Sequence, residues 1–218
     1  MNQKPLEIGM LLFPGFTMLD LVGPLTVFSA HSKIYLLSKS MEPVVSDSGD
    51  IKMLPTTVYR DCPTKLDVLF VPGGYGTFEA MKDAELIELL KAAAPQARYI
   101  TSVCSGSLIL GAAGLLQGFQ ATSHWACREM LSQFGATPVK HRVVADRNRF
   151  TGGGVTAGID FGLTLLAELR GADAAKKAQL FMEYDPQPPF DAGSPDKAGP
   201  EIVQAVRATL DQATPAFQ

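Results

Sequence analysis

Tyr99-Ile-Thr-Ser-Val-Cys104-Ser-Gly-Ser-Leu-Ile-Leu-Gly-Ala-Ala113 is the stretch of this 218-residue chain that decides its fold. Residues 99–103 are uncharged and rich in β-branched side chains, which predicts a short buried strand. Residues 105–113 are small or aliphatic, which predicts a helix packed against that strand. Cys104 stands at the junction, so the stretch predicts a sharp turn from strand to helix with a thiol at its tip.

The thiol of Cys104 is a candidate nucleophile. At such a turn it would be exposed at the carboxyl end of its strand and would face the positive end of the helix dipole, and both conditions favour the thiolate. Most free cysteines are instead small buried hydrophobic residues, and that alternative stays open here.

Outward from this turn, strands and helices alternate. Apolar runs predict buried strands over residues 7–13 and 67–71, and the alternation over 142–151 predicts a hairpin around Asp146-Arg-Asn148. Further strands are expected at 33–38 and 42–46, an extended stretch at 51–59, and helices at 78–94, 126–134, 156–170, 172–184 and 201–212. This order predicts an α/β fold: a mostly parallel sheet with helices on both faces.

Asp20 is the only charged residue between the first strand and Lys33. It falls in the first turn of an apolar helix that Thr17 is expected to cap. A carboxylate there can simply complement the helix dipole. Because parallel strands end at the same sheet edge, Asp20 is also expected beside Cys104, where it could transfer protons.

The loop Pro72-Gly-Gly-Tyr-Gly76 follows a predicted strand and precedes a predicted helix. The backbone amides of Gly73 and Gly74 could therefore face an oxyanion or another developing charge. A loop that only needs positive φ would also use glycine.

Bulk composition excludes several classes of partner. The formal net charge is −3 without a basic run, which argues against binding nucleic acid or an anionic membrane. The three cysteines are too few for a disulfide framework, the N-terminus lacks a signal-peptide pattern, and no stretch approaches a membrane span. We expect a cytoplasmic protein with one domain over residues 1–218, including a Pro-rich segment at 185–200 and a C-terminal helix.

No metal or cofactor is expected. The histidines lack metal-ligand spacing and the cysteines lack Cys-x-x-Cys pairing. Residues 152–157 formally fit a dinucleotide fingerprint, but no second strand ending in an acidic residue follows them. His124, beside Trp125, is interpreted as a packed core or interface residue more readily than as a partner of Cys104.

Five motifs resemble the ThiJ/PfpI superfamily of flavodoxin-like, class I glutamine-amidotransferase-like proteins. They are Phe13-Pro-Gly-Phe-Thr-Met-Leu-Asp-Leu-Val-Gly-Pro24, Val71-Pro-Gly-Gly74, Val103-Cys-Ser-Gly106, Ala121-Thr-Ser-His-Trp125 and Gly154-Val-Thr-Ala-Gly-Ile-Asp160. The resemblance covers about residues 6–182. Together with the segment 183–195, it is strongest toward the members that add water to isocyanides.

The resemblance implies a role for individual residues. Cys104 would be the nucleophile and Asp20, where many relatives have glutamate, its carboxylate partner. The amides of Gly74 and Ser105 would lie near the reacting atom, and Ser105 stands where threonine is expected. The substrate would be a small isocyanide, converted through a thioimidate to an N-substituted formamide without a cofactor, by a homodimer.

Other functions use the same thiol. Cys104 could be the oxidisable group of a stress sensor or protective protein, or the nucleophile of a glyoxalase-like enzyme. A regulatory ligand-binding module is a further alternative, although the chain carries no basic helix-turn-helix segment.

Overall fold

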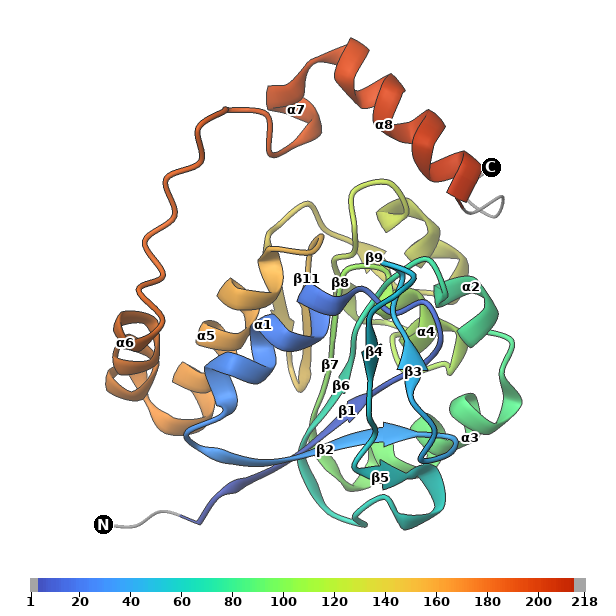
Figure 1. Cartoon of the computed structure of the whole chain (residues 1–218), viewed down its shortest axis with the longest axis vertical. Helices are drawn as coiled ribbons and strands as arrows, with labels where there is room; N and C mark the ends of the chain where they lie inside the picture. The colour runs from blue at the N-terminus through green and yellow to red at the C-terminus, as the bar shows by residue number, and fades with distance from the viewer. Residues whose placement is uncertain (1–3, 214–218) are drawn as a thin grey trace.

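The computed structural model describes residues 4–213 (Figure 1). Residues 1–3 and 214–218 lie outside the described residues. They include the N-terminus that is expected to lack a signal peptide and the end of the domain expected over residues 1–218. A seven-stranded sheet forms the centre, and every neighbouring pair is parallel except β10 with β11. Its order is β10 (Val143–Asp146), β11 (Arg149–Gly152), β7 (Ala97–Val103), β6 (Leu66–Val71), β1 (Leu6–Leu11), β2 (Ser32–Ser38) and β5 (Thr57–Val58).

Helices cover both faces of this sheet, which confirms the predicted α/β architecture. One face carries α1 (Met18–Phe28), α5 (Ala157–Arg170) and α6 (Ala172–Phe181). The other carries α2 (Thr77–Ala80), α3 (Ala84–Ala93) and α4 (Gly106–Ala112), as Figure 1 shows. A sheet enclosed in this way needs strands that are apolar on both sides, and this is the reason for the unbroken apolar runs in the sequence.

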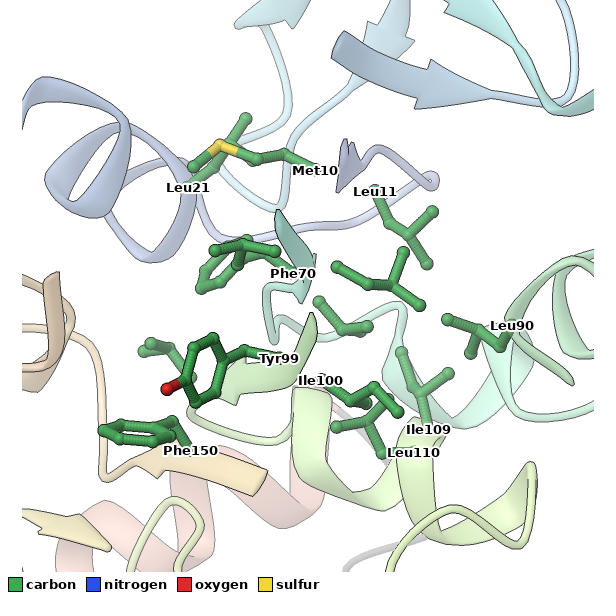
Figure 2. Packing of buried hydrophobic residues seen from close by; sticks show 14 of the residues in the cluster. Met10, Leu11, Leu21, Phe70, Leu90, Tyr99, Ile100, Ile109, Leu110 and Phe150 are labelled. Atoms are coloured by element: carbon green, nitrogen blue, oxygen red, sulfur yellow. The ribbon is translucent and has the colours of Figure 1, made fainter. Parts of the chain in front are cut away.

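The core lies between the sheet and the two helical layers. Consecutive side chains of β1 lie on opposite faces of the sheet: in Figure 2, Met10 lies toward Leu21 of α1 and Leu11 toward Ile109 of α4. On the α1 side, the centre of the Phe70 ring lies 5.6 Å from the centre of the Phe161 ring on α5. These buried side chains hold the strand ends, and hence the loops that follow them, at fixed positions.

Some predicted elements are divided or shortened. The single helix predicted over residues 78–94 is two helices, because the Asp83 side chain accepts hydrogen bonds from the Glu85 and Leu86 amides and starts α3 anew. The strand predicted at 42–46 is only β3 (Val44–Val45), which pairs with β4 (Lys52–Met53) outside the main sheet. Residues Arg128–Phe134 form a 3₁₀ helix where an α-helix is predicted.

The predicted hairpin at Asp146-Arg-Asn148 is confirmed, with Arg147 in the left-handed region at φ 54°. A separate pair of short parallel strands, β8 (Gln120–Ala121) and β9 (Thr137–Pro138), lies outside the main sheet. Among residues 4–213, no helix has the length and apolar character that crossing a bilayer requires.

The C-terminal part of the chain leaves the compact body. After α6 it runs through the Pro-rich segment, which has no helix or strand before α7 (Pro195–Ala198), and then enters α8 (Pro200–Ala213). Figure 1 shows this orange-to-red segment rising along one side of the molecule and α8 lying across its top. The site described below lies under α8.

Candidate active site

The predicted turn at Cys104 is present between β7 and α4. Cys104 has φ 58°, a left-handed conformation that is strained for a residue with a side chain. Its N–H donates to the carbonyls of Gly152 and Gly153, and its own carbonyl accepts hydrogen bonds from the hydroxyls of Ser107 and Ser123. These four interactions fix the turn and compensate for its strain.

The thiol itself is less exposed than the sequence predicts, because Cys104 is only 6% accessible. Burial, followed by the charge of Asp20, raises the pKa of the Cys104 thiol well above its usual value, although the amides of Ser105 and Val155 lower it. The expectation of a resting thiolate is therefore wrong: desolvation outweighs the amides at the helix start. Cys104 rests as a thiol.

Asp20 lies in the first turn of α1 and is completely buried. The Gly73 amide donates to its Oδ2 over 2.9 Å, whereas Oδ1 has no hydrogen-bond partner among the described residues. Burial raises the pKa of Asp20 to about 7, against the Gly73 hydrogen bond and the Cys104 thiol, both of which favour the carboxylate. The structure thus brings the carboxyl and the thiol together, and each changes the proton affinity of the other.

The loop after β1 and the loop after β6 are joined by hydrogen bonds at this edge of the sheet. The Thr17 amide donates to the Gly73 carbonyl, and the Gly76 amide donates to the Gly15 carbonyl. Gly74 has φ 142°, and a Cβ there would lie 2.2 Å from the Gly15 carbonyl oxygen. Both the conformation and the close approach require glycine at residue 74. Glycine in this loop is therefore explained by the backbone and its packing, with no need for a bound anion.

The amides of this loop have different partners from those predicted. The Gly73 amide holds Asp20, and the Gly74 amide donates to the Ser105 hydroxyl over 3.1 Å. That hydroxyl also shares a 2.7 Å hydrogen bond with Thr77. Contacts with Gly74 and Thr77 therefore hold the Ser105 side chain, while its backbone amide, with that of Val155, favours negative charge on Cys104.

A cavity of about 260 Å³ opens above Cys104. It is smaller than the pockets that hold drug-sized molecules, so it suits a small ligand. Its lining residues come from seven segments of the chain: Thr17, Asp47, Gly74, Tyr75, Cys104, Ser105, His124, Val155 and Leu210.

Several of these lining residues were not predicted as part of the site. Thr17 is expected only as a helix cap, yet it makes no capping hydrogen bond, and its hydroxyl donates instead to the Asp47 carboxylate. Asp47 follows β3 in a turn whose sequence gives no indication of a place in the site, and burial raises the pKa of its carboxyl. Tyr75, Val155 and Leu210 likewise reach the cavity through chain packing.

His124 lies in the cavity wall, which differs from its interpretation as a packed core or interface residue. Its Nδ1 accepts the Ala126 amide, and burial, with a smaller effect of the Arg207 charge, lowers the pKa of His124 to about 4. The ring is therefore neutral at pH 7, and the Nδ1 hydrogen bond assigns its proton to Nε2. His124 can offer a hydrogen bond but not a positive charge.

Substituting Gly73 tests how closely the loop fits the turn. A Cβ at residue 73 would lie 2.6 Å from the Ser105 amide and 2.9 Å from the Cys104 Cβ, so Gly73→Ala must displace the turn. We expect the free energy of unfolding to fall by ~1–3 kcal/mol, measured by urea denaturation. Gly193→Ala, where nothing lies within 4 Å, is the control and should change it little. Equal effects of both substitutions would contradict this packing.

Within residues 4–213, no three His, Cys, Asp or Glu side chains are grouped so that they could hold a metal ion.

Comparison with known proteins agrees with this fold. Residues 7–168 match the model of the DJ-1/PfpI family, and the chain belongs to that family. Among curated proteins it is 52% identical over 204 residues to the isonitrile hydratase of Pseudomonas putida, covering 93% of this chain and 89% of that protein. It is also 31% identical to the HTH-type transcriptional regulator GbdR of Pseudomonas aeruginosa, over 83% of this chain but 52% of the regulator.

Solved structures give the same family. A ThiJ/PfpI family protein from Pseudomonas syringae superposes with a TM-score of 0.93 at 51% identity, covering 99% of this chain and 89% of that one. DJ-1beta of Drosophila melanogaster superposes with a TM-score of 0.74 at 22% identity, covering 83% and 98%. The second likeness concerns the fold alone.

Proposed function

We propose that this protein is an isonitrile hydratase, which adds water to an isocyanide and releases an N-substituted formamide. The observation that carries the proposal is a small cavity lined by the Cys104 thiol, which interacts with the fully buried carboxyl of Asp20. The 52% identity to the Pseudomonas putida isonitrile hydratase, over nearly the whole of both chains, supports the same activity.

The pair holds the protons that the first step needs. With a thiol of raised pKa and a carboxyl of pKa about 7, the site near neutral pH holds one proton on Cys104 and can leave Asp20 ionised. Attack therefore does not require a resting thiolate, because Asp20 can take the thiol proton as the sulfur approaches the substrate.

In the first step, the Cys104 sulfur forms a bond to the terminal isocyanide carbon and its proton passes to Asp20. The carbon retains an electron pair, and this pair takes the proton back from Asp20. The product is a thioimidate in which the carbon bears sulfur and hydrogen and is doubly bonded to nitrogen. Asp20 ends the step ionised, ready to act again.

In the second step, water adds across the carbon–nitrogen double bond. Asp20 takes one proton from the water and delivers that proton to the nitrogen, so that Asp20 is ionised again and the tetrahedral carbon bears hydroxyl, sulfur, nitrogen and hydrogen. The carbon–sulfur bond then breaks, the hydroxyl becomes the formamide carbonyl, and its proton returns to Cys104. Isocyanide and water are thereby converted to formamide with both side chains restored.

Neighbouring groups fit these steps. The Nε2–H of His124 is a donor in the cavity wall suited to the substrate nitrogen or the added oxygen. The Ser105 amide favours negative charge on the sulfur when the carbon–sulfur bond breaks.

We also propose that the protein acts in the cytoplasm as a homodimer. The three cysteines are all free thiols, which suits a reducing compartment. Leu180 and Phe181 at the end of α6 are 81% and 85% exposed, which is unusual for large apolar side chains. A second copy of the chain would cover such side chains.

A redox-sensor role is less well supported. Sensor cysteines are exposed and have a low pKa, whereas Cys104 is buried and its pKa is raised. The glyoxalase-like alternative uses the same thiol and is decided by assay.

The test is an activity screen of the purified full chain with aromatic and aliphatic isocyanides against 1,2-dicarbonyls. We expect formamide from the isocyanides, with one oxygen-18 atom incorporated from labelled water and detected by mass spectrometry. Turnover of the dicarbonyls together with no formamide would overturn the proposal.

A further inference from the structure

Helix α8 contributes a side chain to the candidate active site. Leu210 lines the same cavity as Cys104, although the two residues are more than one hundred positions apart in sequence. Leu210 also lies beyond residue 168, where the match to the family model ends. The part of the chain that defines the family therefore builds the base of the cavity, and a later segment builds one of its walls.

The contacts that hold α8 in place involve only partly covered side chains. The Arg207 guanidinium lies 4.8 Å from the centre of the Trp125 ring, a cation–π distance. Ile202, Val203 and Val206 line a groove beside Trp125. These residues and Leu210 follow helical spacing on one side of α8, so a single face of the helix lies against the body.

The side chains that attach α8 to the body are less buried than those of the core. No described residue of α8 is buried, whereas most of the apolar residues in β1 and α4 are. Upstream of α8, the linker is joined to the body by the ion pair of Lys140 with Asp196. The side chains of α8 can therefore be changed without removing part of the hydrophobic core.

We propose that Leu210 is a specificity-determining residue of the hydration reaction and that α8 is the roof of the cavity, selecting isocyanides with a small apolar substituent. The inference rests on the proposed function, because Cys104 and Asp20 fix the isocyano carbon at the base. The substituent is linear with that carbon through nitrogen, so it extends away from the base, toward the apolar side chains of Val155 and Leu210. The size of residue 210 then limits the length of the substituent.

The first test is a substrate series of isopropyl, phenyl and 2-naphthyl isocyanide. Leu210→Trp should lower kcat/KM for phenyl isocyanide by about tenfold or more and for isopropyl isocyanide by much less, since one methylene in an apolar pocket can change it about tenfold. Leu210→Ala should raise kcat/KM for 2-naphthyl isocyanide relative to isopropyl isocyanide. Gln204→Ala changes an exposed α8 residue that does not line the cavity at Cys104; it is the matched control and should keep the wild-type order.

The second test does not depend on isocyanide turnover. The alkylation rate of Cys104 by iodoacetamide is measured by peptide mass spectrometry, with Cys62, which lies outside the cavity, as internal reference. Leu210→Ala and Arg207→Ala should each raise the rate at Cys104 severalfold and leave that at Cys62 unchanged.

The outcomes separate the two proposals. If the wild-type protein hydrates no isocyanide, the proposed function fails, and the alkylation rates still decide whether α8 covers Cys104. If it hydrates isocyanides but all Leu210 variants keep the wild-type substrate order, or Gln204→Ala changes it equally, the specificity role of Leu210 is overturned. Unchanged alkylation of Cys104 in both variants would overturn the proposal that α8 covers the cavity.

Discussion

Replacing Cys104 with alanine is expected to lower formamide production from an aromatic isocyanide by at least about a thousandfold in kcat/KM. Cys104 carries the only thiol among the residues that line the cavity, and both proposed steps need the bond between its sulfur and the substrate carbon. Without it, neither the thioimidate nor the tetrahedral species can form. The rate of formamide release is measured under steady-state conditions, with the formamide quantified by chromatography.

The Cys104→Ala protein should remain folded. The four hydrogen bonds that hold the turn use backbone atoms of residue 104, so alanine keeps them. Circular dichroism and thermal unfolding would check this directly. Cys62→Ala, which removes a thiol outside the cavity, is the matched control and should keep wild-type turnover. Formamide production by Cys104→Ala equal to the wild type would reject the nucleophile.

Replacing Asp20 with asparagine should lower kcat/KM by about a hundredfold or more, the usual contribution of a positioned acid–base group. Asparagine has the same shape and can still accept the Gly73 amide, but it cannot take the thiol proton or return it to carbon. Asp20→Glu keeps the carboxyl at a displaced position and should retain part of the rate. Unchanged kinetics in Asp20→Asn would leave Asp20 with a structural role alone.

The pH dependence of kcat/KM for the wild-type protein should reflect the ionisation of the Asp20 carboxyl. Below pH 7, Asp20 is protonated and no base is present to take the thiol proton, so kcat/KM should rise with pH through about 7. Because the pKa of Cys104 is raised well above its usual value, the fall at high pH should come only under strongly alkaline conditions. Asp20→Asn should lack the rise near pH 7.

Stability should respond in the opposite direction. The pKa of Asp20 is about 7 in the folded protein and near 3.8 when unfolded, so the folded state binds more protons between these values. Its contribution to the free energy of unfolding is therefore greatest below pH 4 and is lost as pH rises to 7. At pH 8, Asp20→Asn should be more stable than the wild type by ~2 kcal/mol in urea denaturation. Lower stability than the wild type would show that the buried charge is compensated elsewhere.

Local sequence patterns determined the parts of this protein that depend on neighbours in the chain. Residues 99–113 contain the strand, the turn and the helix within one continuous segment, so their hydrophobic pattern predicts both the fold class and the position of Cys104. The isolated charge of Asp20 after the first strand was visible for the same reason. A parallel sheet then brings these two strand ends to one edge, whatever the details of packing.

Tertiary structure alone decided how the site is completed and how its groups titrate. Asp47, His124 and Leu210 reach the cavity from segments whose local patterns indicate a turn, a core residue and a surface helix. The Gly73 and Gly74 amides, predicted to face the reacting atom, donate instead to Asp20 and Ser105. Burial, which depends on the packing of the whole chain and not on the residues next to Cys104, makes that cysteine rest as a thiol although its helix start favours the thiolate.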